Sequence, residues 1–219
     1  ANQAYNIDTN GQNVTFASAL TSSGGTLTKT SSGTLTLSGN NTYSGETVVS
    51  AGTLSITNNN GLGSTAGGTT VASGAILDLS GVTVGSETIT LSGGTLKDIT
   101  SSLAGNIILT ADSTISATNA NDVLTLSGAI SGSFAITKAG LGTVIFTGTN
   151  TYTGGTNINA GTLSLGSASP WGASGTISFG GGTLQYSASN TTDYSARFSS
   201  AANQAYNIDT NGQNVTFAS

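Results

Sequence analysis

The side chains best suited to acid–base chemistry are nine carboxylates, and neither His nor Cys accompanies them. Without His the commonest general base is missing, and without Cys no disulfide or thiolate metal site can form. Cleavage of a polysaccharide needs two carboxyl groups held roughly 5 to 10 Å apart. No two of these acids are adjacent in the sequence, so only stacking of distant segments could join a pair. We expect the acids to lie at exposed turns; they are Asp8, Glu46, Asp78, Glu87, Asp98, Asp112, Asp122, Asp193 and Asp209.

The sequence therefore predicts no catalytic residue, no cofactor-binding residue and no metal ligand, and we do not expect an enzyme. Calcium at Asp-containing turns stays open, because hard cations need several clustered oxygens. Residues 61–66 superficially resemble a dinucleotide fingerprint, but that motif needs a following helix, and residues 67–71 read as a strand. Tyr43 and Tyr152 could stack against carbohydrate, although a repeated turn aromatic more often packs on its own turn.

Charge is scarce throughout the chain. Charged residues make up 6% of the sequence and the net charge is -5, whereas about 25% charged residues is usual. Nucleic acids require a basic surface, so we exclude them as partners, since the only cations are Lys29, Lys97, Lys138 and Arg197. No run of about 20 apolar residues predicts a membrane span. The lack of an initiator Met and of a signal peptide leads us to expect an internal segment of a longer, exported protein.

The elements that would position any site are short strands. Apolar residues alternate over four to six positions between Gly, Asn and Ser, and no helical period is found. Only Asn10-Gly11 has the two-residue turn typical of a hairpin. A parallel solenoid stacks like side chains on like, which favours Thr, Asn and apolar residues over charges. We therefore predict an all-β fold, a right-handed parallel β-helix (β-solenoid), with the hand following from the chirality of parallel crossovers.

A long repeat joins the two ends of the chain. Residues 1–18 and 202–219 are identical. Either one end has been duplicated artificially, or units about 200 residues long follow one another in tandem. We favour tandem units, with 1–201 as one unit and 202–219 as the start of the next. The two 18-residue segments should then share one backbone conformation and lie along one axis, roughly 40 to 50 Å apart.

A short repeat lies inside the unit. Residues 27–56 and 136–165 align without a gap, and about half the positions are identical, including Thr-Lys, Gly-Thr and Asn-Thr-Tyr. These two segments resemble the autotransporter-associated β-strand repeat, also called the passenger-associated transport repeat. That resemblance implies a right-handed parallel β-helix in a bacterial protein secreted to the cell surface. The first copy departs from the second at Thr30-Ser31-Ser32 and at Glu46, where the second has Gly155.

From these patterns we expect a structural rod or fibre segment of an extracellular or cell-surface protein, stacked head to tail on neighbouring copies of the unit. The alternative is an adhesin-type module that holds a glycan or a host surface protein along its side. The two short repeats should superimpose, and their inward-facing apolar residues should form the core. The predicted core residues are Leu27, Leu35, Leu37, Val49, Leu54, Ile56, Ile136, Val144, Phe146, Ile158, Leu163 and Leu165.

Overall fold

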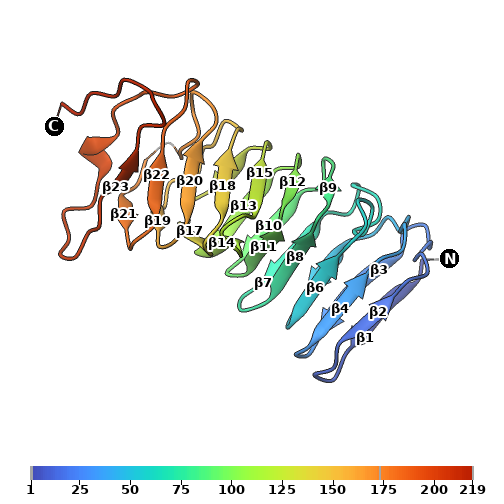
Figure 1. The fold of residues 1–219 in the computed structure, drawn as a ribbon. Coiled ribbons are helices and arrows are strands. Elements are labelled where there is room, and N and C mark those ends of the chain that lie inside the picture. Colours follow the sequence, from blue (N-terminus) through green and yellow to red (C-terminus); the bar gives the residue numbers. More distant parts are fainter. Residues whose placement is uncertain (1, 173, 219) are drawn as a thin grey trace.

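The chain winds into an elongated stack of turns whose strands form three long sheets (Figure 1). The computed structural model describes residues 2–172 and 174–218. Every pairing between two named strands in these residues is parallel. Ile89 lies beside Ile107, and Thr183 beside Asn207, so one turn uses 18 to 24 residues. The predicted all-β parallel solenoid is confirmed.

The three sheets differ in the part of the chain that they cover. Sheet A contains β1 (Ala4–Asp8), β3 (Thr26–Thr30), β5 (Thr47–Val49), β7 (Thr69–Ala72), β10 (Ile89–Ser92), β13 (Ile107–Ala111) and β16 (Ile130–Gly132). Sheet B contains β2 (Val14–Phe16), β4 (Thr34–Leu37), β6 (Thr53–Ile56), β8 (Ile76–Ser80), β11 (Thr95–Ile99), β14 (Ser113–Ala117), β17 (Ile136–Ala139), β19 (Thr156–Ile158) and β21 (Ile177–Phe179). Sheet C contains β9 (Thr83–Val84), β12 (Ser101–Leu103), β15 (Val123–Leu126), β18 (Thr143–Phe146), β20 (Thr162–Leu165), β22 (Thr183–Gln185) and β23 (Asn207–Asp209). A single 3-10 helix, η1 (Ser195–Arg197), lies at the C-terminal end of the described stack (Figure 1).

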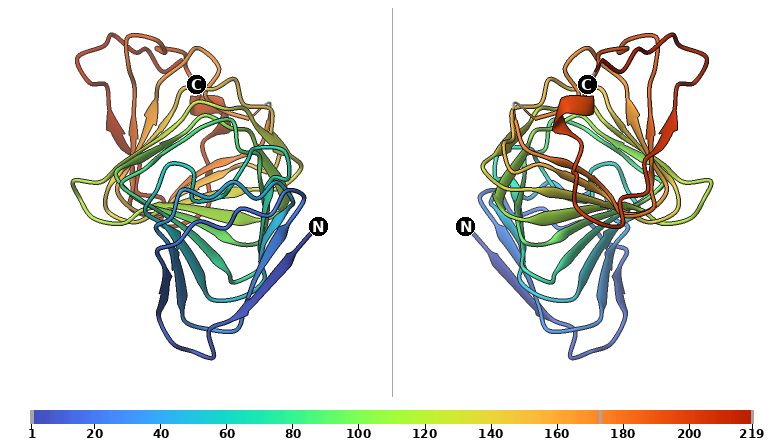
Figure 2. Two further views of the ribbon diagram at one scale, coloured as in Figure 1. Left: turned by 90° about the vertical axis from the view of Figure 1, so that its right-hand side faces the viewer. Right: turned by 90° about the vertical axis from the view of Figure 1, so that its left-hand side faces the viewer.

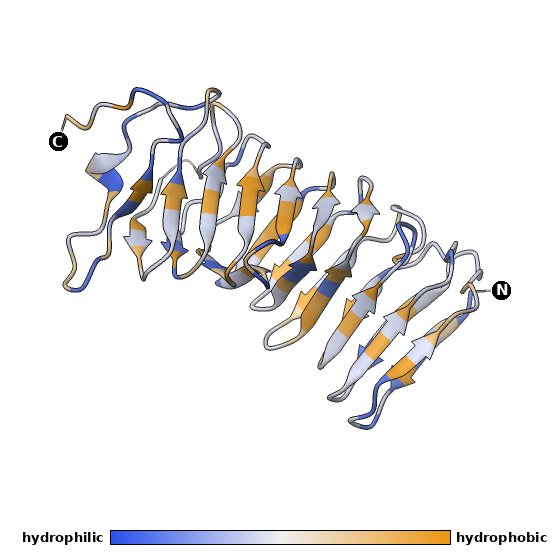
Figure 3. Cartoon of the chain, in the orientation of Figure 1, coloured by the Kyte–Doolittle hydropathy of each residue, from blue (hydrophilic) through white to orange (hydrophobic). Residues whose placement is uncertain are grey.

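The core runs along the interior that the three sheets enclose (Figure 2). Inward-facing side chains form columns from one turn to the next, as in the run Leu35, Leu54 and Leu77 of sheet B. Bands of apolar residues therefore cross successive strands (Figure 3). All twelve residues that the sequence predicted for the core are buried, with at most 1% of their surface exposed.

The two short repeats have the same strands but occupy different sheets. Strands β3, β4, β5 and β6 of the first copy alternate between sheets A and B. Their counterparts β17, β18, β19 and β20 alternate between sheets B and C. Each repeat supplies two strands per turn and leaves its third side, residues 38–46 or 147–155, without a strand. The intervening turns have three strands each. The second copy therefore begins in sheet B, whereas the first begins in sheet A.

The two identical ends form the same turn in different surroundings. Asn10 and Gly11 have φ of 47° and 78°, and Asn211 and Gly212 have φ of 50° and 73°. However, β1 pairs with β3 in sheet A, whereas β23 pairs with β22 in sheet C. Residues 215–217 form no strand, although their counterparts 14–16 are β2. The first of these turns is also not a hairpin, because it is a corner between sheets A and B.

Candidate functional site

Each short repeat buries a lysine at a corner of the solenoid. Lys29 shares the inward face of β3 with Leu27, and its side chain is fully buried. Its ammonium group donates to the carbonyl oxygens of Thr30 at 2.6 Å, Ser31 at 2.7 Å and Ala51 at 3.2 Å. These carbonyls belong to two successive turns, so the side chain ties one corner to the next. We call this arrangement, a buried lysine that binds carbonyl oxygens of two successive turns, a corner clamp.

The second copy repeats this clamp. Lys138 donates to the carbonyl oxygens of Ala139 at 2.8 Å, Gly140 at 2.9 Å and Ala160 at 2.9 Å. Burial lowers the pKa of Lys138 to about 8, and it also lowers the pKa of Lys29. Three charge-assisted hydrogen bonds satisfy the buried ammonium in each case. The role of both lysines is structural.

In each repeat an Asn and a Tyr hold together the side that carries no strand. The Asn41 amide accepts from the N–H of Leu20 at 2.8 Å and donates to the carbonyl of Gly61 at 2.6 Å, which links three turns. Tyr43 is fully buried, and its hydroxyl lies 2.6 Å from the hydroxyl of Thr47.

The second copy makes the same contacts. The Asn150 amide joins the N–H of Ile130 to the carbonyl of Pro170, and the Tyr152 hydroxyl lies 2.6 Å from that of Thr156. Tyr152 is as fully buried as Tyr43. Because neither ring is accessible, the two tyrosines pack within their own turns and offer no platform for carbohydrate.

The expectation that the acids lie at exposed turns is wrong for four of them. Glu46, Asp8, Asp112 and Asp209 are exposed and Asp193 is partly exposed. The buried acids are Asp78, Glu87, Asp98 and Asp122. Only Asp98 faces inward from a strand; Asp78 lies between the inward residues Leu77 and Leu79, and Glu87 and Asp122 belong to connecting segments.

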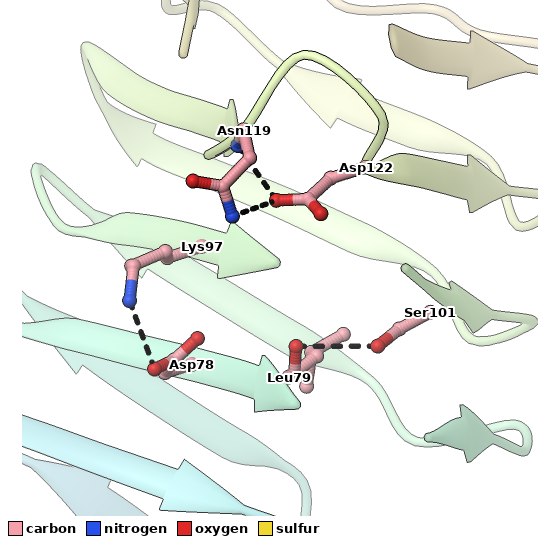
Figure 4. Close-up of polar contacts among 6 residues, drawn as sticks. All are labelled: Asp78, Leu79, Lys97, Ser101, Asn119 and Asp122. Carbon is pink, nitrogen blue, oxygen red and sulfur yellow. Dashed lines mark hydrogen bonds and ion pairs between the residues drawn. The ribbon is translucent and has the colours of Figure 1, made fainter. Parts of the chain in front are cut away.

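Hydrogen bonds and one ion pair hold most of these buried acids (Figure 4). Asp78 forms an ion pair with Lys97 at 3.0 Å. Asp122 accepts from the N–H of Asn119 at 2.6 Å and from its side-chain amide at 2.9 Å. Glu87 accepts from the hydroxyl of Thr69 at 2.7 Å. Each of these three carboxylates therefore has a partner within the fold, although one oxygen of Asp78 and one of Glu87 are buried without a hydrogen bond among the described residues.

Asp98 is the exception among the buried acids. It faces inward from β11, and none of its surface is exposed. Burial raises the pKa of Asp98 to about 6, and the nearby charge of Asp122 adds to the shift. The N–H groups of Thr100 and Ser101 and the Ser101 hydroxyl oppose the shift, but none makes a well-formed hydrogen bond to the carboxylate. Since Asp98 and Asp122 are both buried, neither can reach a polysaccharide chain.

The remaining candidates from the sequence can also be placed. Residues 61–66 form a loop that leads into β7, so the helix of a dinucleotide site is missing there. Within residues 2–172 and 174–218, no three acids lie together in a way that could hold a metal ion. In the same residues no helix is long and apolar enough to cross a membrane.

Comparison with known proteins agrees with this repeat geometry. The Passenger-associated-transport-repeat family matches residues 27–56 and 136–165, the two segments that carry the clamps. An adhesin BmaC autotransporter of Brucella suis biovar 1 (strain 1330) is 36% identical over 156 residues. The match includes 68% of this chain, and the chain spans only 4% of that relative's length. No solved structure matches the chain. The chain is therefore a repeat segment of the passenger-associated transport repeat family, folded as a parallel β-solenoid.

Proposed function

We propose that the chain is a non-enzymatic rod segment of a bacterial protein exposed at the cell surface. One observation carries the proposal. The segment 202–219 has the sequence that begins the unit, and its strand β23 pairs in parallel with β22, the preceding strand of sheet C. The start of a unit can thus continue the stack of the unit before it. Units joined in this way would bury each other's open ends.

Neighbouring copies of the unit are the partners that we propose first. The contact that we expect between them is the one that β23 makes with β22, a parallel pairing of the strand that begins one unit with a strand of the unit before it.

The test is the length of proteins that contain one, two and three units. Each added unit should lengthen the particle by roughly 40 to 50 Å, as measured by small-angle scattering and electron microscopy. The joint between units should also resist protease as well as the interior of a unit does. Separate beads joined by a protease-sensitive linker would refute the continuous rod. Protease treatment of intact cells of the source bacterium would test surface exposure independently.

An adhesive role is the second candidate. It is favoured by the name of the matched relative, an adhesin autotransporter. We propose that any adhesive ligand, a glycan or a surface protein, binds along the side of the rod. Binding of the isolated unit to host cells or to glycan arrays tests this role. A unit that binds neither would refute the adhesive role and leave the structural role as the proposed function.

A further inference from the structure

The second short repeat departs from the first at one elaborated place. In each copy an Asn side-chain amide donates to a backbone carbonyl of the next turn, Asn41 to Gly61 in the first copy and Asn150 to Pro170 in the second. Gly61 and Pro170 are therefore at equivalent positions. The following residue is Leu62 in the first copy and Trp171, the only Trp of the chain, in the second. Both side chains are almost fully buried. The second copy thus has Trp171 at the position where the first copy has Leu62.

The next turn differs as well. In the first copy residues 81–94 complete the turn from β8 to β11 of the same sheet. In the second copy residues 186–206 complete the turn from β22 to β23 of the same sheet, so this turn is longer, and it includes η1. This segment places Tyr194 against Trp171, with ring centroids 5.8 Å apart and the rings edge to face. Residues 186–206 form the next turn of the stack, since Phe198 bridges in parallel to Ile177 and β23 pairs with β22. Tyr194 belongs to the side of this turn that carries no strand, one turn after Trp171.

A hollow of about 290 Å³ lies between these elements. Asn150, Trp171, Tyr194 and Arg197 line it, and they come from three successive turns. A larger hollow of about 620 Å³ also borders Arg197. The first volume is close to the lower limit for small-molecule sites, roughly 300 Å³. Arg197 therefore borders both hollows.

The polar groups of this hollow are suited to an anion. Arg197, the only Arg of the chain, donates to the carbonyls of Gly172, Ser174 and Gly175 at 3.1, 2.6 and 2.9 Å. These bonds use three of its five N–H donors. The one ion pair in the described part of the chain joins Lys97 to Asp78, so the charge of Arg197 is not neutralised there. A carboxylate is the natural partner of a positioned guanidinium group.

One further donor belongs to the aromatic pair. Trp171 is almost fully buried and its indole Nε1 is not exposed, so it supports Tyr194 by ring contact and offers a ligand no hydrogen bond. The hydroxyl of Tyr194 accepts from the amide of Asn190 at 2.8 Å, which leaves its proton to donate. Aromatic side chains with a polar tip combine apolar contact area with a hydrogen bond. That combination matches a sugar ring, which presents C–H groups on its faces and hydroxyls at its rim.

We propose that this hollow binds a carboxylate-bearing sugar unit of an acidic glycan, with its carboxylate at Arg197. The chain offers a built-in reporter, because its single Trp lines the site. Trigalacturonate and trisialic acid should each be titrated while the Trp fluorescence is followed, with maltotriose as the neutral trisaccharide. At least one acidic trisaccharide should cause a saturable change, and maltotriose should bind at least about tenfold more weakly.

Three variants make the test specific. Arg197→Gln should weaken binding of the acidic trisaccharide by roughly tenfold or more. Trp171→Leu installs the residue that the first repeat carries at this position, so the fold should persist while calorimetry shows lost binding. Lys97→Gln removes an equal charge from sheet B and should bind as the parent does. Circular dichroism and the Tm of each variant establish that it is folded.

The outcomes decide the proposal without reference to the rod. Failure of both acidic trisaccharides to bind, equal binding of maltotriose, or unchanged binding by Arg197→Gln would each overturn it. Formation of a continuous rod does not depend on any of these results, so the two proposals fail separately.

Discussion

Replacing Asp98 by Asn removes a buried charge that the fold holds without a strong partner. Asp98 has no exposed surface, and burial raises its pKa from 3.8 to about 6. A carboxyl group whose pKa is raised on folding stabilises the protein while it is protonated. That contribution is complete below about pH 4 and is lost as the pH rises through about 6. Above that pH, the native state contains a buried charge.

The size of the effect follows from the pKa. A shift of about two pKa units corresponds to about 3 kcal/mol, which is the upper limit of the cost. Two effects of the substitution reduce this figure or leave it unchanged. The Asn side-chain oxygen can still accept from the N–H groups of Thr100 and Ser101, but the added NH₂ group needs an acceptor, which lowers the gain. We therefore expect Asp98→Asn to raise the free energy of unfolding by about 1 to 2 kcal/mol at pH 7.5. At pH 4 we expect no gain.

Urea unfolding at half-unit intervals from pH 4 to pH 8 measures this difference. Subtracting the parent curve cancels the contribution of Glu87, whose pKa burial also raises. Glu46→Gln removes the same charge from an exposed side chain, and serves as the control for net charge. A variant that loses stability equally at pH 4 and pH 7.5 would falsify the reasoning, because the carboxylate would then be held by hydrogen bonds that outweigh its burial.

Five other substitutions test the stack. Leu54→Ala and Leu163→Ala, at equivalent and fully buried positions, should each cost roughly 2 to 5 kcal/mol in urea unfolding, and a large difference between them would contradict the equivalence of the repeats. Lys138→Met leaves three corner carbonyls without a donor and should cost roughly 2 to 4 kcal/mol by the same measurement; an unchanged midpoint would show that the clamp is dispensable. Gly105→Ala would place a Cβ 1.7 Å from the Glu87 carbonyl oxygen, whereas Gly85→Ala would meet nothing within 4 Å. The first should lower the Tm steeply and the second should leave it nearly unchanged, and equal shifts would mean that the turns are not packed this closely.

The strands and the core could be predicted from the sequence because both depend on local alternation. Leu35 and Leu37, or Val144 and Phe146, lie two residues apart between glycines, so the inward face follows directly. The buried lysines left a signal of the same kind. Lys29 lies two residues after Leu27, on the inward face, and the second copy repeats it as Lys138. A cation at an inward position in both copies indicates an internal partner.

Other features depend on distant residues and leave no local signal. The sheet that a strand joins depends on the number of strands and connecting segments before it. The residues of the second repeat therefore could not predict that it lies in sheets B and C instead of A and B. Asp98 is buried because it follows Leu96 by two positions, on the inward face of a strand that lies between β8 and β14 in sheet B. The hollow at Arg197 is lined by residues of three successive turns, and the sequence of any one turn does not reveal it.

The different placement of the two identical ends has a consequence for valency. Asn6–Asp8 lie in sheet A and their counterparts Asn207–Asp209 in sheet C, so each unit of a continuous rod would be turned by one side relative to its neighbour. Equivalent surface points would trace a spiral and face the same direction only at every third unit, a spacing of roughly 120 to 150 Å. A flat surface could then engage one unit in three, whereas flexible chains surrounding the rod could engage them all. Avidity would therefore favour a mesh of polymers over a planar array of receptors.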